Sequence, residues 1–205
     1  MSQLSSHLHK DAHIRLALRQ KKLQRFDVDE NSLVIDELGL AHARSRIDVA
    51  VLNGCLHGYE IKSERDTLER LQSQLATYRR TLGRLTYVCS SKHVERTLEL
   101  TPDWCGVIEA ERGRRGAVLF KTLRRTRSNP EIEPIMLAHL LWRDEVVSIL
   151  RERRVEGQIA NKRRLELYEI LSDLLSLREL TAEIRRAFLK RENWRDRPVR
   201  LSYGD

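Results

Sequence analysis

The chain reads RIDVAVLNGCLHGYEIK over residues 46–62, and this pattern predicts two strands joined by a tight turn. In residues 46–52, branched apolar side chains alternate with Arg46, Asp48 and Ala50, which is the period of a strand with one buried face. Asn53-Gly54 is a strong turn signal, and the return strand is predicted over residues 56–63. The stretch therefore predicts a hairpin that carries acidic side chains on both strands.

The length of the turn decides whether the two acids meet. Glu60 and Lys62 share a strand face because they are two residues apart. Asp48 joins them only if the connection holds an odd number of residues or a bulge, since a strict two-residue turn places Asp48 opposite Tyr59. A three-residue loop over residues 52–54, with its glycine in the left-handed conformation, satisfies this condition. We therefore expect a bulged hairpin here.

The residue types on that face suit phosphate chemistry. Two carboxylates that converge can hold a hard divalent cation through oxygen ligands. A lysine beside them can orient or deprotonate an attacking water, or neutralise charge that develops on a phosphate. Asp48, Glu60 and Lys62 are therefore the leading candidates for a catalytic site.

The remaining sequence predicts an α/β fold, with a mixed central sheet flanked by helices and a C-terminal helical extension. Helices are expected over residues 10–24, 66–82 and 92–100, and further strands over 33–35, 85–90, 104–108 and 117–123. Beyond Pro130 and Pro134 the pattern is almost wholly helical, over about 134–154, 161–177 and 179–192. We expect a domain over residues 1–128 and a helical region over 129–205 that serves packing, oligomerisation or DNA contact.

Positive charge is concentrated in one short segment. The chain has 205 residues and a net charge of +8, and residues 111–130 hold seven basic residues but one acidic residue. Such a cluster suits a phosphate backbone, because each neutralised phosphate releases counterions. A solvated basic loop explains the same composition, so the cluster gains weight only beside a nucleic-acid site. Its members are Arg112, Arg114, Arg115, Lys121, Arg124, Arg125 and Arg127.

Other features exclude several classes of protein. The three cysteines are widely spaced and form no CxxC pair, which argues against a disulfide framework and a structural zinc site. No apolar stretch approaches the roughly 20 residues of a membrane span, and the N-terminus lacks the apolar core of a signal peptide. We expect a cytoplasmic protein without a membrane partner.

Asp48 followed by Glu60-Ile61-Lys62 resembles the D…ExK core of the PD-(D/E)XK, or restriction-endonuclease-like, nuclease superfamily. Gln74 and Tyr78 are similar to the QxxxY motif of its RecB-like branch, and their spacing places both on one helical face. The wider stretch over residues 36–63 also resembles a group of small bacterial proteins assigned to this superfamily. The chain departs from the family pattern at residue 47, where an isoleucine replaces the proline.

The resemblance implies roles for individual residues. Asp48, Glu60 and the carbonyl of Ile61 would bind Mg²⁺ or Mn²⁺, and Lys62 would position the water. Gln74 and Tyr78 would steady the substrate phosphate or the site.

The family also has an acidic residue upstream of the aspartate. Glu37 is the first candidate for this position, and Asp11 on the predicted first helix is the second.

The expected function is hydrolysis of DNA phosphodiester bonds by a Mg²⁺-dependent nuclease, with Arg46 and the basic segment holding the backbone. RNA cleavage is a less favoured option. The alternative from another class is a catalytically inactive nuclease-fold protein that binds nucleic acid or a protein partner. The resemblance also leaves a homodimer open, because many nucleases of this fold pair to cut two strands.

Overall fold

A computed structural model describes residues 5–113 and 116–191, with side chains from residue 11 onward. Within these residues, six strands form one sheet in the order of the chain. The pairs β1–β2, β2–β3 and β5–β6 are antiparallel, whereas β3–β4 and β4–β5 are parallel, so the predicted mixed sheet is confirmed. The strands are β1 (Leu33–Leu40), β2 (Ser45–Leu52), β3 (Leu56–Lys62), β4 (Arg84–Cys89), β5 (Gly106–Arg112) and β6 (Val118–Arg124).

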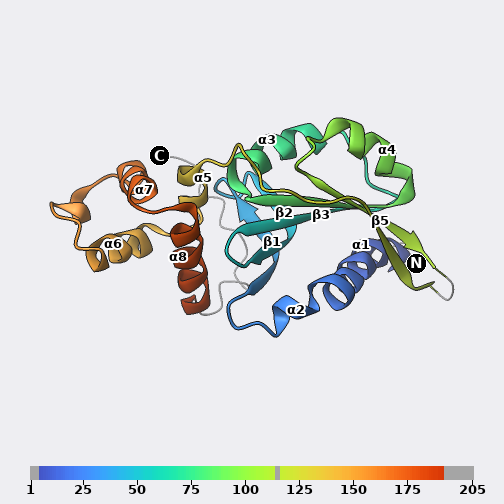
Figure 1. Ribbon diagram of the computed structural model, residues 1–205, viewed down its shortest axis with the longest axis horizontal. Coiled ribbons are helices and arrows are strands. Elements are labelled where there is room, and N and C mark those ends of the chain that lie inside the picture. The colour runs from blue at the N-terminus through green and yellow to red at the C-terminus, as the bar shows by residue number, and fades with distance from the viewer. Residues whose placement is uncertain (1–4, 114–115, 192–205) are drawn as a thin grey trace.

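Helices cover both faces of the sheet (Figure 1). The crossover helices α3 (Leu71–Thr81) and α4 (Ser91–Leu100) lie together on one face, as the shared handedness of two successive parallel crossovers requires. The other face is covered by α1 (Ser5–Leu18), a π-helical turn η1 (Arg19–Leu23) and α2 (Gln24–Asp27). Leu18 and Leu23 are fully buried there against strand residues.

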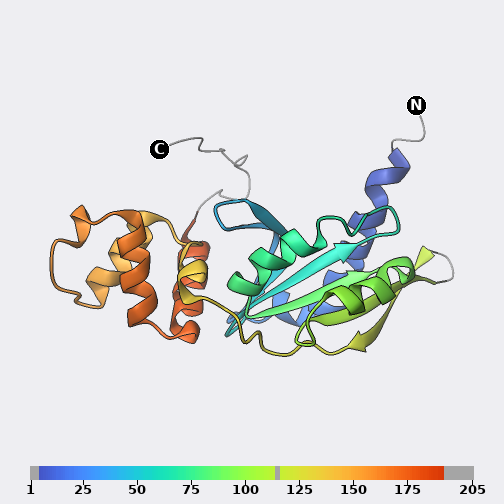
Figure 2. The same cartoon turned by 90° about the horizontal axis from the view of Figure 1, so that it is seen from above.

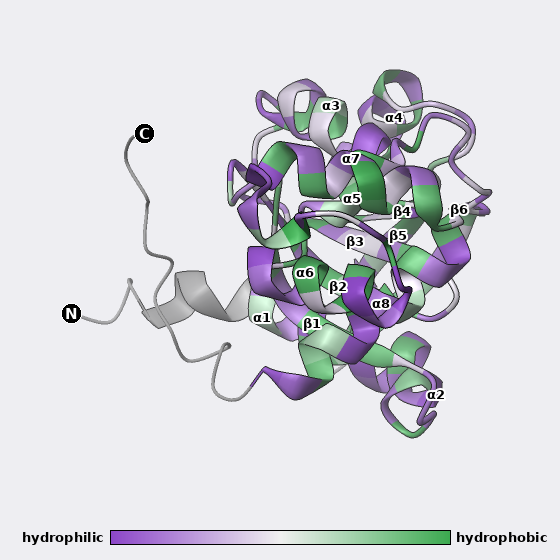
Figure 3. Ribbon diagram, turned by 90° about the vertical axis from the view of Figure 1, so that its left-hand side faces the viewer, coloured by the Kyte–Doolittle hydropathy of each residue, from purple (hydrophilic) through white to green (hydrophobic). Residues whose placement is uncertain are grey.

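The C-terminal helices gather beside one end of the sheet (Figure 2). They are α5 (Pro134–Ala138), α6 (Arg143–Glu152), a 3₁₀ turn η3 (Ile159–Asn161), α7 (Arg164–Leu174) and α8 (Leu177–Lys190). Hydrophobic and hydrophilic stretches alternate along these helices (Figure 3), and one buried apolar cluster runs from Ile35 in β1 to Phe188 in α8. The helical extension is therefore packed onto the α/β part. None of the described helices is both long and apolar enough to cross a membrane.

Several predicted element boundaries are wrong. The single helix expected over 134–154 is two helices, because the Glu145 carboxylate accepts the Trp142 N–H at 2.6 Å and starts α6 anew. The helix expected from residue 66 starts at Leu71, since Asp66 instead accepts the N–H and hydroxyl of Ser63 at 2.7 and 2.8 Å. Strand β1 extends to Leu40, well past the expected end at residue 35.

The predicted odd-length turn between β2 and β3 is confirmed. Leu52 pairs with Leu56, so three residues form the loop, and Gly54 has a left-handed φ of 66°. The loop is Asn53–Cys55, one residue later than predicted. The strand pairing ends at Val49 with Tyr59, and the same register continued by one residue places Asp48 opposite Glu60.

Side chains along β1 and β2 do not alternate regularly between the two faces of the sheet, and the irregularity lies at paired positions of the two strands. Ile35 and Leu38 belong to the same buried cluster although they are three residues apart, and the same holds for Ile47 and Ala50. Between the first pair, Glu37 has a left-handed φ of 57°, which is uncommon for a residue with a side chain. This irregularity lets Glu37 and Asp48 both line the cleft described next.

Candidate functional site

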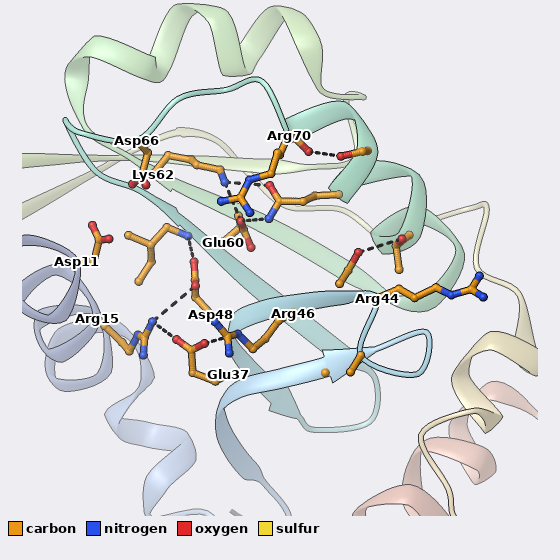
Figure 4. A pocket seen from close by; sticks show the side chains of 17 residues that line it. Asp11, Arg15, Glu37, Arg44, Arg46, Asp48, Glu60, Lys62, Asp66 and Arg70 are labelled. Atoms are coloured by element: carbon orange, nitrogen blue, oxygen red, sulfur yellow. Dashed lines mark hydrogen bonds and ion pairs between the residues drawn. The ribbon is translucent and has the colours of Figure 1, made fainter. Parts of the chain in front are cut away.

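A cleft of about 700 Å³ opens between α1, the β1–β2 turn, the end of β3 and the start of α3 (Figure 4). Asp48, Glu60, Lys62 and Gln74 line it together with both candidates for the upstream acid, so these sequence-predicted residues meet in one place. Its charged lining comprises the acids Asp11, Glu37, Asp48, Glu60 and Asp66, and the bases Arg15, Arg44, Arg46, Lys62 and Arg70.

Glu60 and Lys62 form a buried ion pair at the end of β3, where they are 3% and 7% exposed. The Lys62 Nζ donates to Glu60 Oε1 at 2.9 Å and to Gln74 Oε1 at 3.0 Å. The amide of Gln74 in turn donates to Glu60 Oε1 at 2.8 Å. Each charged group therefore has several hydrogen-bond partners, which a buried ion pair needs to offset its desolvation.

Tyr78 completes this network from the next turn of α3. Its hydroxyl donates to Glu60 Oε2 at 2.8 Å and lies 2.9 Å from the main-chain carbonyl of Arg46. Burial and the adjacent Glu60 carboxylate raise the pKa of Tyr78 far above its ordinary value, so the hydroxyl remains a neutral donor. Gln74 and Tyr78 thus hold the Glu60 side chain in place.

Asp48 lies where the β2–β3 pairing ends. Its Oδ2 accepts the N–H of Ile61 at 2.7 Å. The Asp48 side chain therefore satisfies a β3 N–H that a main-chain carbonyl of β2 would accept if the pairing continued. Its Oδ1 is 3.6 Å from the Arg15 guanidinium. Burial, followed by the charge of nearby Glu60, raises the pKa of Asp48 to about 7. Two adjacent carboxylates repel each other here, and a divalent cation between them would remove that repulsion.

The two candidates for the upstream acid differ in their surroundings. Glu37 forms ion pairs with Arg15 and with Arg46, whose Nε is 2.5 Å from Glu37 Oε2. Asp11 Oδ1, in contrast, is buried and has no hydrogen-bond partner among the described side chains. An orphaned carboxylate oxygen beside the cleft fits a cation ligand better than a carboxylate already neutralised by two arginines.

A magnesium ion fits this donor set. No three His, Cys, Asp or Glu side chains within the described ranges come together as a metal-binding group. Mg²⁺ needs fewer, because it is commonly held by one or two carboxylates and completes its octahedron with water and substrate phosphate. Asp48 and Glu60 would supply the two carboxylates, and Ile61 also lines the cleft.

Comparison with known proteins places the chain in a family. The sequence profile described as Bacteriophage P4 protein cII matches residues 5–197. The chain belongs to this family. It is 26% identical to Protein cII of Enterobacteria phage P4 over 150 residues, which cover 73% of this chain and 56% of that protein. The chain therefore spans little more than half the length of its curated cII relative. No solved structure matches the chain significantly.

The basic residues expected to bind nucleic acid are only partly at this site of the cII-family chain. Arg46 lines the cleft. Arg112, Lys121, Arg125 and Arg127 belong to β5, β6 and the segment after β6, at the far edge of the sheet from β1 and β2, and do not line it. Arg114 and Arg115 lie outside the described residues.

Arg124 is used inside the fold. Its guanidinium donates to the Cys105 carbonyl at 2.7 Å and the Leu98 carbonyl at 3.2 Å, and also to the Thr101 hydroxyl. These bonds tie β6 to the end of α4, which leaves this side chain few donors for a phosphate.

Two arginines that line the cleft, Arg15 and Arg70, were missed by reasoning from the sequence. Arg15 is four residues after Asp11 and Arg70 is four residues before Gln74, so helical spacing could have revealed both. Arg44, whose place just before the predicted strand over residues 46–52 suggests a phosphate contact, follows the left-handed residues of the β1–β2 turn and also lines the cleft.

Proposed function

We propose that this chain is a divalent-metal-dependent nuclease that hydrolyses DNA phosphodiester bonds with an activated water. One observation carries the proposal: Asp48, Glu60, Lys62 and Gln74 line one cleft, and the buried Tyr78 joins the last three in a hydrogen-bonded network. DNA as the substrate follows from the resemblance of these motifs to PD-(D/E)XK nucleases.

Asp48 and Glu60 would hold the metal ion, with Asp11 as a further carboxylate at the same cleft. When bound, Mg²⁺ supplies a Lewis acid for the phosphate and a water of lowered pKa. The Lys62 ammonium, fixed by Glu60 and Gln74, is placed to neutralise the charge that develops on the phosphate.

The residues around this centre keep its geometry. Tyr78 donates to the Glu60 oxygen that Lys62 leaves free, so both oxygens of that carboxylate are oriented. The Ile61 N–H holds the Asp48 carboxylate in position where the pairing of β2 with β3 ends. Such preorganisation lets the site stabilise charge without rearranging during the reaction.

Cleavage assays test the proposal directly. The purified chain is incubated with single- and double-stranded DNA and RNA in Mg²⁺, in Mn²⁺ and in EDTA. Asp48→Asn and Lys62→Ala are compared with Asp173→Asn, which alters an exposed acid on α7. We expect metal-dependent cutting of DNA that falls at least about 100-fold in the two site variants and is unchanged in the control.

Other outcomes contradict the proposal. Cutting in EDTA, or cutting that survives both site substitutions, would indicate a contaminant or a different active site. Salt-sensitive binding without cutting, retained in both site variants, would instead support the catalytically inactive binding protein.

A further inference from the structure

The turn between β1 and β2 has an unusual backbone. Ala41, His42 and Ala43 have consecutive left-handed φ angles of 49°, 57° and 65°, and none of them is glycine. Side chains rarely adopt this conformation, and such residues persist where surrounding contacts hold them. The turn presents Arg44 at the rim of the cleft.

Stacked rings connect this turn to the C-terminal helices. The rings of His42 and His139 stack with centroids 4.8 Å apart, and His139 in turn contacts Tyr168 with centroids 4.7 Å apart. Tyr168 is buried, whereas His42 is exposed at the outer end of the stack. Arg164, at the start of α7, lies over the Tyr168 ring at 5.4 Å and donates to its hydroxyl at 2.7 Å.

Two arginines flank these rings without an acidic partner. Arg15 and Arg46 in the cleft are paired with Glu37, but no carboxylate among the described side chains pairs with Arg44 or Arg164. Both guanidiniums are exposed, and in Figure 4 the Arg44 side chain extends away from Asp48 and Glu60.

The surroundings of the two histidine rings between these arginines favour the neutral form of each ring. Partial burial, followed by the charges of Arg164 and Arg44, lowers the pKa of His42 below its ordinary value. Burial and the neighbouring His42 and Arg164 lower the pKa of His139 to about 4. The surface thus consists of flat rings, for which the neutral form is favoured, between the guanidinium groups of Arg44 and Arg164.

We infer that the His42–His139–Tyr168 stack, with Arg44 and Arg164, binds a single nucleic-acid strand that continues out of the cleft. The arginines suit two backbone phosphates, and the exposed His42 ring suits an unpaired base. A duplex keeps its bases stacked inside and would use only the arginines. The direction of the strand, from the cleft toward α7, rests on the proposed nuclease function, but binding to this surface does not.

Binding measurements in EDTA test the surface without any cleavage. The full chain is titrated into a labelled oligothymidylate and into a labelled duplex, and fluorescence anisotropy gives the affinities over a range of salt. Arg44→Ala and Arg164→Ala are each expected to weaken single-strand binding about fivefold near 0.1 M salt. Each phosphate contact releases ~0.7 counterions from a single strand, and a variant that loses the contact loses this contribution to the affinity. Arg151→Ala on α6, also exposed, is the matched control and should change nothing.

His42→Asn removes the ring while keeping a residue that tolerates the left-handed conformation. We expect single-strand affinity to fall roughly fivefold or more, from the loss of one stacked base, with the salt slope and the duplex affinity unchanged. Arg164→Lys keeps the charge but loses the bond to Tyr168, so retained affinity in this variant would assign the effect of Arg164→Ala to charge.

Three results would overturn the inference: equal losses of duplex and single-strand affinity in His42→Asn, no effect of His42→Asn, or a loss in the Arg151→Ala control as large as in the two arginine variants. Failure of this surface and failure of the nuclease are distinguishable. A chain that cuts DNA normally with Arg44 and Arg164 both replaced retains the proposed function but not this surface. A chain that never cuts but shows the expected losses retains the surface alone.

Discussion

Replacing Asp48 by asparagine should make the metal-free protein more stable at neutral and alkaline pH. The Asp48 carboxylate lies beside Glu60 at the end of the β2–β3 pairing, and burial raises its pKa from the ordinary 3.8 to about 7. Below about pH 4 the group is protonated in both the folded and the unfolded chain, so it does not affect the free energy of unfolding. As the pH rises toward 7, the unfolded chain releases this proton while the folded chain retains it, and unfolding becomes progressively easier.

The size of this effect follows from the two pKa values. A change from 3.8 to about 7 corresponds to ~4 kcal/mol between the protonated and ionised states. The side chain is 25% exposed, so solvent screening reduces the penalty. Asparagine can still accept the Ile61 N–H through its own side-chain oxygen, so that hydrogen bond is kept. We expect Asp48→Asn to raise the free energy of unfolding by about 1–3 kcal/mol at pH 8.

Urea unfolding in EDTA between about pH 4 and pH 8 measures the difference. Wild type and Asp48→Asn should be similar at the acidic end, separate as the pH rises, and differ by a constant amount above about pH 7. Adding Mg²⁺ should stabilise the wild type more than the variant, because a ligand that binds only the folded state raises its stability. Asp173→Asn serves as the control for loss of an exposed carboxylate.

Two results would refute the reasoning. A gain in stability that does not depend on pH would show that charge repulsion at Asp48 is not its source. An asparagine variant less stable than wild type at pH 8 would show that Asp48 is stabilised as a carboxylate in the absence of metal.

Three further predictions concern individual side chains. Tyr78→Phe should lower the free energy of unfolding by about 1–3 kcal/mol, since Glu60 Oε2 and a main-chain carbonyl lose their buried donor; an unchanged urea midpoint would contradict this. Arg124→Ala should lower the thermal midpoint without weakening DNA binding, because its guanidinium bonds to the last turn of α4 and to the segment between α4 and β5; a loss of affinity at constant stability would place it in the interface instead. Asp11→Asn should weaken Mn²⁺ binding about tenfold in a calorimetric titration and Glu37→Gln should weaken it less; the reverse order would make Glu37 the upstream ligand.

The strands and the D…ExK spacing were predictable from the sequence because their signals are local. Alternation over residues 46–52 and the Asn53-Gly54 turn signal depend only on neighbouring residues; the strand forms where expected, and the loop forms one residue later than predicted. The odd length of the turn was predictable from the requirement that Asp48 and Glu60 share a face. Helical spacing of Gln74 and Tyr78 likewise placed both side chains on the buried side of α3.

Composition could not locate the basic segment relative to the cleft. Counting charges identified residues 111–130, but the strand order decides where they lie, and β6 is at the edge of the sheet opposite β1. A charge count also treats Arg124 and Arg44 alike. The first is bonded within the fold, and the second is exposed at the rim of the cleft.

The amino-acid sequence by itself determined the α/β class, the hairpin and the pairing of two acids with a lysine on one strand face. Only the tertiary structure decided that Arg15 neutralises Glu37, that Asp11 keeps an orphaned oxygen, and that His42 stacks on His139. The physical reason is distance along the chain. Periodicity reports which face of its own element a residue occupies, whereas these contacts depend on how α1, the β1–β2 turn and the C-terminal helices pack against one another.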